Sequence, residues 1–236
     1  MDGCGIIQGV YDTLPEDLAY DQLVDFGDKL LIPAMNDMHV HAPQLGNMGI
    51  AMDMQLLPWL NTYIFPEETK FADEAYAETI YHSFVSELWR HGTMRAAVFA
   101  TVHTPATHIL ARAFNEAGMG ALIGLVGMDR HTPATLCNTP TEWAAGMQTL
   151  IESLASMPLV KPIITPRFIP SCTPEMLRCM GEMAKQTLLP VQSHLSENQQ
   201  EIAWVHELEP EATCYGDAYY RYGLFGQTRT LMAHCC

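Results

Sequence analysis

The chain has 236 residues, of which 48% are hydrophobic and 17% charged, a composition typical of a globular protein with one large apolar core. Its formal net charge is −15 and no stretch gathers Lys or Arg, so nucleic acids and anionic membranes are not expected as partners. Seven scattered cysteines, without a C-x-x-C pair, argue against a disulfide framework and favour a reducing, cytoplasmic location. We also expect no signal peptide and no membrane-spanning segment, because no apolar run approaches the roughly 18 residues that a span needs.

From about residue 30 onward, short apolar runs alternate with longer amphipathic stretches. The apolar runs predict six strands, at residues 29–35, 94–102, 121–128, 159–168, 188–195 and 228–234. The stretches between them predict five helices, at residues 73–92, 104–118, 141–156, 173–187 and 196–208.

The ends of these helices carry recognisable signals. Gly92 and Gly118 should stop the first two helices. Thr104 and Thr173, each followed by proline, should cap the second and the fourth helix. Ser196, with a glutamine three residues later, predicts a capping box at the start of the fifth.

The alternation of strands and helices indicates an α/β protein with a parallel sheet that is covered on both faces. Two closures are compatible with it, an open doubly wound sheet and a (β/α)8 barrel of about 250 residues. No G-x-G-x-x-G follows the first strand, so a dinucleotide site is not predicted. The sequence contains only six of the eight strands that a barrel needs, so we expect residues 31–236 to form a partial barrel.

Four histidines stand at the ends of predicted strands. His39 and His41 are two residues apart, and strand side chains alternate between faces, so both imidazoles should point to one side. His194 and His234 end the fifth and sixth strands, and barrel active sites form at these strand ends. The pair alone could equally be exposed, but three such strand ends favour a metal site, since catalytic zinc commonly takes three protein ligands. The other six histidines fall in helices or loops, where a solvated side chain is the simpler interpretation.

Two further positions suit chemistry at the same end of the sheet. Glu197 follows His194 by three residues, where its carboxylate would stabilise a helix start or move protons beside a metal site. Arg167 and Phe168 follow the fourth strand, so the guanidinium could donate to ring or carbonyl acceptors while the ring stacks on a planar substrate.

The motifs HVHAPQ, FATVHT, TPRF, SHLSEN and MAH, in this order, resemble the guanine deaminases of the amidohydrolase superfamily. The segment LLPWLNTYIFPEE is similar to the substrate-side loop of that family, and the resemblance runs from about residue 30 to the last residue. It implies a zinc-bearing (β/α)8 barrel that hydrolyses guanine to xanthine and ammonia, and a homodimer.

Matching positions also imply a role for each site residue. The zinc ligands would be His39, His41 and His194. The residues beside the purine would be Gln44, Arg167, Phe168, His194 and Glu197. Glu197 would carry protons between water and the ring, and His234 would orient the attacking hydroxide and polarise the site.

The sequence departs from the family's pattern in three places. The aspartate that follows the eighth strand and completes the metal site is absent, so we expect a truncated chain. Residues 1–30 are expected to be only a remnant of the family's N-terminal β-sandwich segment. The family's MAHG is MAHCC here. Two alternatives therefore stay open: an amidohydrolase that acts on another heterocycle, and an inactive zinc-binding fragment.

Overall fold

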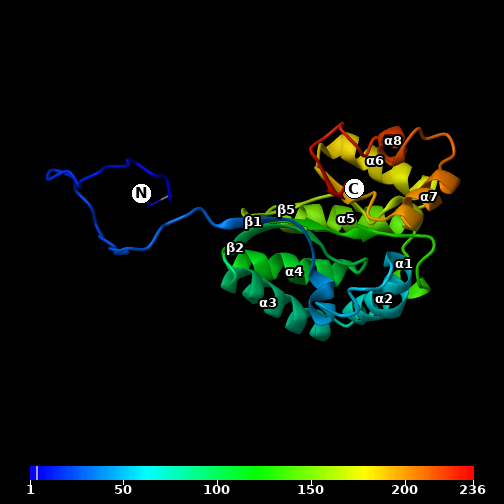
Figure 1. The fold of residues 1–236 in the computed structure, drawn as a ribbon, viewed down its shortest axis with the longest axis horizontal. Helices are drawn as coiled ribbons and strands as arrows, with labels where there is room; N and C mark the ends of the chain where they lie inside the picture. The colour runs from blue at the N-terminus through cyan, green and yellow to red at the C-terminus, as the bar shows by residue number, and fades with distance from the viewer. Residues whose placement is uncertain (4) are drawn as a thin grey trace. The chain divides into compact units, whose positions relative to one another are not determined.

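A computed structural model describes residues 1–3 and 5–236, which divide into two units, Met1–Pro33 and Ala34–Cys236 (Figure 1). The described residues of the first unit form no strand or helix, and apolar side chains such as Val10 and Leu30 are 89% and 85% exposed. The predicted first strand at residues 29–35 is therefore wrong in its bounds. Pro33 has no N–H to give to a ladder, and pairing begins only after it. That residues 1–30 derive from a β-sandwich stays a prediction.

The second unit contains eight strands, all paired in parallel. They are β1 (Met35–His41), β2 (Thr93–Phe99), β3 (Gly120–Gly124), β4 (Val126–Gly127), β5 (Val160–Pro162), β6 (Thr165–Pro166), β7 (Val191–Leu195) and β8 (Thr230–His234). The predicted third and fourth strands are each split in two, into β3 with β4 and β5 with β6. Pro162 and Pro166 have no backbone N–H to donate, so they interrupt the hydrogen-bond ladder of the fourth predicted strand.

The strands follow one another across the sheet in their order along the chain. The ladders run β1-β2-β3-β5, β4-β6 and β7-β8, and a bridge between Ile164 and Val191 joins the fourth segment to the fifth. A doubly wound sheet reverses its strand order at a switch point, whereas a barrel keeps it sequential. The fold is therefore that of a partial (β/α) barrel with six of its strand segments, as predicted.

Helices connect the successive strands and pack against each other, α3 on α4, α4 on α5 and α5 on α6 (Figure 1). They are α3 (Glu74–Arg90), α4 (Thr104–Glu116), α5 (Pro140–Leu154), α6 (Pro174–Thr187), α7 (Gln199–Leu208) and α8 (Tyr215–Arg221). All but α8 were expected from the apolar periodicity. In the parts of the chain that the structure describes, no helix combines the length and the apolar character needed to cross a membrane.

The helix ends confirm some of the sequence signals and correct others. Gly92 and Gly118 follow helices with φ of 80° and 67°, and the Thr173 hydroxyl accepts the N–H of Met176. The capping box predicted at Ser196 is wrong: the cap of α7 lies two residues later, at Asn198, which forms the box together with Glu201. Thr104 is likewise the first residue of α4 rather than its cap, and no side chain caps that helix.

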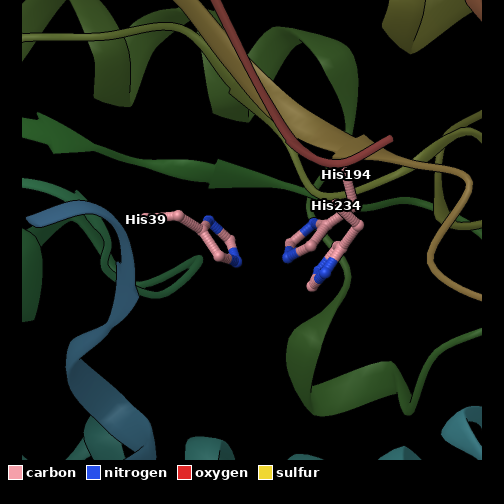
Figure 2. A group of neighbouring side chains, drawn as sticks. All are labelled: His39, His194 and His234. Atoms are coloured by element: carbon pink, nitrogen blue, oxygen red, sulfur yellow. The ribbon is translucent and has the colours of Figure 1, made fainter. Parts of the chain in front are cut away.

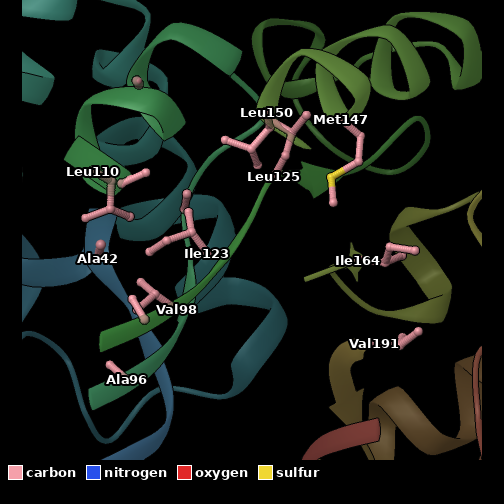
Figure 3. Packing of buried hydrophobic residues seen from close by; sticks show 14 of the residues in the cluster. Ala42, Ala96, Val98, Leu110, Ile123, Leu125, Met147, Leu150, Ile164 and Val191 are labelled. Atoms are coloured by element: carbon pink, nitrogen blue, oxygen red, sulfur yellow. The ribbon is translucent and has the colours of Figure 1, made fainter. Parts of the chain in front are cut away.

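The apolar core lies between the sheet and these helices. Val98 and Ile123 of adjacent strands are fully buried beside Leu110 of α4 and Leu150 of α5 (Figure 3). The indole of Trp143 in α5 donates to the backbone oxygen of Leu125 over 3.1 Å, so the one polar atom of this large side chain is satisfied.

A helical segment between β1 and α3 covers the carboxyl ends of the strands. It consists of the 3-10 turn η1 (Ala42–Asn47), α1 (Leu56–Trp59), the π-helical turn η2 (Leu60–Ile64), α2 (Phe65–Thr69) and the 3-10 turn η3 (Lys70–Ala72). Leu60, Ile64 and Phe65 pack on Phe99 and Phe168 in a second, smaller apolar cluster. This cluster fixes the segment over the place where the strand-end side chains gather.

Candidate active site

All eight predicted site residues line a single cavity of about 140 Å³. Its lining consists of His39, His41, Gln44, Leu56, Trp59, Leu60, Arg167, Phe168, His194, Glu197 and His234. The strand ends supply the polar groups, and the helical segment between β1 and α3 supplies Gln44 and the apolar wall. The other histidines, at residues 82, 91, 103, 108, 131 and 206, are all described and lie outside this lining.

The two histidines of β1 lie on the same side of their strand, as the two-residue spacing predicts. Their ring centroids are 5.1 Å apart and the rings are nearly perpendicular. The ring of His41 stacks on Phe99 at the end of β2 with centroids 4.6 Å apart, and Phe99 is completely buried. Phe99 thus packs against one face of the His41 ring and fixes its plane.

The contacts of His194 settle which of its nitrogens is free. Its Nδ1 lies 2.5 Å from the backbone oxygen of Arg167, which can only accept, so Nδ1 carries the hydrogen in the neutral ring. The Nε2 atom then has a lone pair, and it lies 2.9 Å from Nε2 of His41. Two nitrogens bound to one tetrahedral zinc ion at about 2.0–2.1 Å would be roughly 3.3 Å apart, so the two rings need to separate only slightly to share an ion.

A fourth histidine, His234, extends the group across the site. The ligand atoms of His39, His194 and His234 all lie within 4.8 Å of one another, and Figure 2 shows their rings pointing toward a common space. The three side chains come from β1, β7 and β8, which are far apart in sequence. His234, predicted to orient the nucleophile, thus stands as close to this group as the predicted ligands do.

The surroundings keep the imidazoles of His39, His41 and His194 neutral. Burial, followed by the nearby His234 and Arg167, lowers the pKa of His39 to about 4. Burial and neighbouring histidines hold the pKa of His41 and His194 well below the ordinary value of histidine. Neutral imidazole is the form that binds a metal, and a set of imidazole nitrogens suits zinc.

Glu197 stands beside His234 at the rim of the cavity. Its Oε2 lies 3.4 Å from His234 Nε2, and about 29% of its side chain is exposed. Burial raises the pKa of Glu197, the nearby His234 opposes the rise, and Glu201 adds to it. The carboxylate of Glu201, itself completely buried, accepts the backbone N–H of Glu197 over 2.7 Å and the hydroxyl of Tyr215 over 2.6 Å. The buried carboxylate of Glu201 therefore anchors the turn between β7 and α7 that carries Glu197.

Arg167 and Phe168 line the cavity where it meets the helical segment between β1 and α3. Arg167 is only 2% exposed, and its Nη1 donates to Oε2 of Glu68 over 2.6 Å. Its guanidinium also lies over the ring of Phe65, with Cζ 5.3 Å from the centroid. The cavity thus offers a fixed donor group and an aromatic face next to the histidines.

Two residues that shape the site were not predicted. Phe99 is the first residue of the motif FATVHT, and in the structure it ends β2 opposite His41 of β1. Its place in that motif is the feature of the sequence that could have identified it. Glu68 is harder to identify from the sequence, because its partner Arg167 is 99 positions away. The local feature that distinguishes it is a pair of glutamates that follows a largely apolar stretch.

Comparisons with known proteins identify a family and several similar proteins. The sequence model described as the amidohydrolase family matches residues 30–236. A guanine deaminase from Dictyostelium discoideum is 41% identical over 217 residues, which are 91% of this chain and 48% of that protein. A guanine deaminase from Escherichia coli (strain K12) is 38% identical over 213 residues, which are 89% of this chain and 48% of that protein.

A solved structure extends the similarity to three dimensions. The guanine deaminase from C. acetobutylicum, with guanine bound in its active site, has a TM-score of 0.91 and 44% identity. The match covers 94% of this chain and 54% of that one. The chain thus spans about half the length of the curated relatives that it matches.

Proposed function

The chain belongs to the amidohydrolase family, and from that premise we propose that its strand-end cavity hydrolyses guanine to xanthine and ammonia with the help of zinc. The observation that carries the proposal is the convergence of all eight predicted site residues on one cavity. The similarity to a structure with guanine in its active site supports the choice of substrate.

The imidazoles of His39, His41 and His194 would hold the zinc ion. The fixed tautomer of His194 and the neutral state of all three rings support this assignment. Zinc, when bound, lowers the pKa of a water molecule toward about 7 and so makes a nucleophile available at neutral pH.

Glu197 would move the protons of the reaction. Its raised pKa suits a carboxyl group that takes a proton from water and gives it to a ring nitrogen of the purine. The nearby Nε2 of His234 would orient the water for addition at the carbon that carries the amino group. The carbon–nitrogen bond to the exocyclic amine then breaks, and the amine leaves as ammonia with the proton that the added hydroxyl group gives up as it becomes the carbonyl of xanthine.

Arg167, Phe168 and Gln44 would recognise the substrate. The N–H groups of the guanidinium match the O6 and N7 acceptors of guanine, whereas the amino group of adenine offers a donor at the O6 position. The ring of Phe168 provides a face on which the purine can stack. Gln44 adds an amide that can both donate and accept.

The proposal is tested by ammonia release from guanine with purified, zinc-loaded protein. We expect turnover that is lost after zinc is removed with a chelator and restored by zinc. An absence of ammonia release from zinc-loaded protein would overturn the proposal for this chain and favour the zinc-binding fragment. A homodimer and a cytoplasmic location stay predictions, which light scattering and cell fractionation would test.

A further inference from the structure

Arg167 is tied by a buried ion pair to the helical segment that covers the strand ends. We propose that Glu68, which does not touch the cavity, is a positioning residue that holds Arg167 in the orientation needed to read the purine's carbonyl edge. This inference rests on the proposed function, since it assigns the recognition of guanine to Arg167.

The pair is close and almost completely excluded from solvent. Arg167 Nη1 and Glu68 Oε2 are 2.6 Å apart, and the two residues are 2% and 1% exposed. Arg167 directly follows β6, whereas Glu68 belongs to α2. In such a place each charge needs the other, because an unpaired buried charge is strongly unfavourable. The ion pair therefore couples the position of α2 to that of the guanidinium.

The guanidinium is fixed on two sides and free on a third. Glu68 takes one N–H, and the ring of Phe65 lies against the face of the group. A guanidinium has five N–H donors, and among the described residues no other side chain accepts from Arg167. Since Arg167 also lines the cavity, its remaining donors are available to an acceptor placed there.

Glu68 acts through Arg167 rather than on the substrate. Its side chain is absent from the cavity lining, and its second oxygen, Oε1, is buried without a hydrogen-bond partner among the described residues. The hydroxyl of Tyr81 is buried and unpartnered as well, and burial together with Glu68 raises the pKa of Tyr81, so it stays neutral. Within the described residues, the one strong interaction of the Glu68 carboxylate is thus with Arg167.

The preceding residue provides a matched control. Glu67 lies on the same helix and is 8% exposed, but it accepts from Lys70 over 2.6 Å and from the hydroxyl of Tyr76. Among the described residues, no hydrogen bond or ion pair joins Glu67 to Arg167. Glu67→Gln therefore removes a buried charge from α2 without touching the proposed positioning interaction.

The test compares Glu68→Gln with Glu67→Gln in the full, zinc-loaded chain. Loss of the charged partner should raise the KM for guanine about tenfold while kcat changes less, because misplacement of the donor weakens binding. The competitive inhibition constant of 2-aminopurine, which lacks the carbonyl oxygen, should change less than the KM for guanine. Glu67→Gln should leave both values near those of the unchanged protein. Melting temperatures separate these effects from loss of folding.

Two further variants make the positioning role specific. Glu68→Asp keeps the charge and should restore most of the guanine affinity. In an Arg167→Met background, Glu68→Gln should have no additional effect on KM, because residues that act as a unit are not additive. Equal effects of Glu68→Gln and Glu67→Gln, or an unchanged KM in Glu68→Gln, would overturn this inference while leaving the proposed function intact.

Direct binding separates the inference from the proposed function. Equilibrium dialysis of guanine against zinc-loaded protein measures affinity even in the absence of turnover. If the protein binds guanine without releasing ammonia, the proposed reaction fails, and a weaker affinity in Glu68→Gln still supports the positioning role. If it neither binds nor hydrolyses guanine, both proposals fail.

Discussion

The ring of His39 in β1 lies 5.4 Å from the ring of His234 in β8, although these are the first and the last strands of the sheet. Neighbouring strands are about 4.8 Å apart, so five intervals in a flat sheet would separate these strands by roughly 24 Å. The sheet must therefore curve as a barrel wall does. This curvature brings histidines from distant parts of the chain to one cavity.

Removal of one of the clustered histidines should abolish tight zinc binding. We expect His39→Ala to weaken zinc affinity by more than the roughly 10–100-fold that loss of an outer-shell partner causes. Metal analysis after dialysis measures the bound zinc. His82→Ala, on the exposed face of α3, is the control and should retain the metal. Full zinc content in His39→Ala would remove this residue from the ligand set.

Neutralisation of the proposed proton carrier should affect the reaction and spare the metal. Glu197→Gln keeps the size of the side chain but cannot accept a proton, so kcat should fall by roughly 10²–10⁴-fold with zinc content unchanged. Ammonia release and metal analysis on the same samples measure both. Glu207→Gln, on the exposed side of α7, should behave like the unchanged protein. A kcat for Glu197→Gln within a few-fold of the unchanged value would contradict the assignment.

The turn behind Glu197 should matter for both stability and rate. Glu201→Ala removes the N-terminal box of α7 and the partner of Tyr215, so the free energy of unfolding should fall by about 1–3 kcal/mol. The kcat should fall by roughly tenfold, because the backbone of Glu197 loses its anchor. Urea unfolding and ammonia release measure the two effects.

A second capping box serves as the control for Glu201. Glu142 occupies the same position in the capping box of α5, and it does not line the cavity. Glu142→Ala should lower stability and leave kcat unchanged. An equal loss of kcat in both variants would show that the rate follows stability alone.

Close packing inside the sheet predicts a further stability difference. A Cβ atom at Gly124 in β3 would overlap the hydroxyl of Thr165 and meet the amide of Gln192, so Gly124→Ala should lower the free energy of unfolding by about 1–3 kcal/mol. In α8, a Cβ atom at Gly216 would lie 3.6 Å from Leu195, an ordinary contact. Gly216→Ala should therefore be neutral or slightly stabilising in urea unfolding. Equal losses would contradict this account of the packing.

The sequence predicts the six strand segments and the residues at their ends, because apolar runs and strand-end histidines are local patterns. It misplaces the start of β1: Leu30 and Ile32 form an apolar run but are exposed, whereas the strand itself includes the polar Asn36 and Asp37. No helix was predicted for the glycine- and tyrosine-rich stretch that forms α8. Tyr215 and Tyr219, four residues apart and stacked at 5.6 Å, are the helical signal within it.

The missed contacts of the site are those that depend on tertiary packing. The partner of Arg167 is 99 positions away, and nothing near either residue in the sequence indicates that they meet. The Asn198 cap replaces Ser196 because Ser196 adopts φ of 56°, which ends β7 and delays the helix by two residues. Both features follow from how α2 and α7 are placed on the sheet.

Anomalous diffraction at the zinc absorption edge, from crystals of the zinc-loaded protein, tests the central claim most directly. The account predicts one strong peak in the cavity, at about 2.0–2.1 Å from ring nitrogens of His39, His41 and His194. A peak on surface histidines or cysteines instead, with the cavity histidines bonded only to one another, would contradict it.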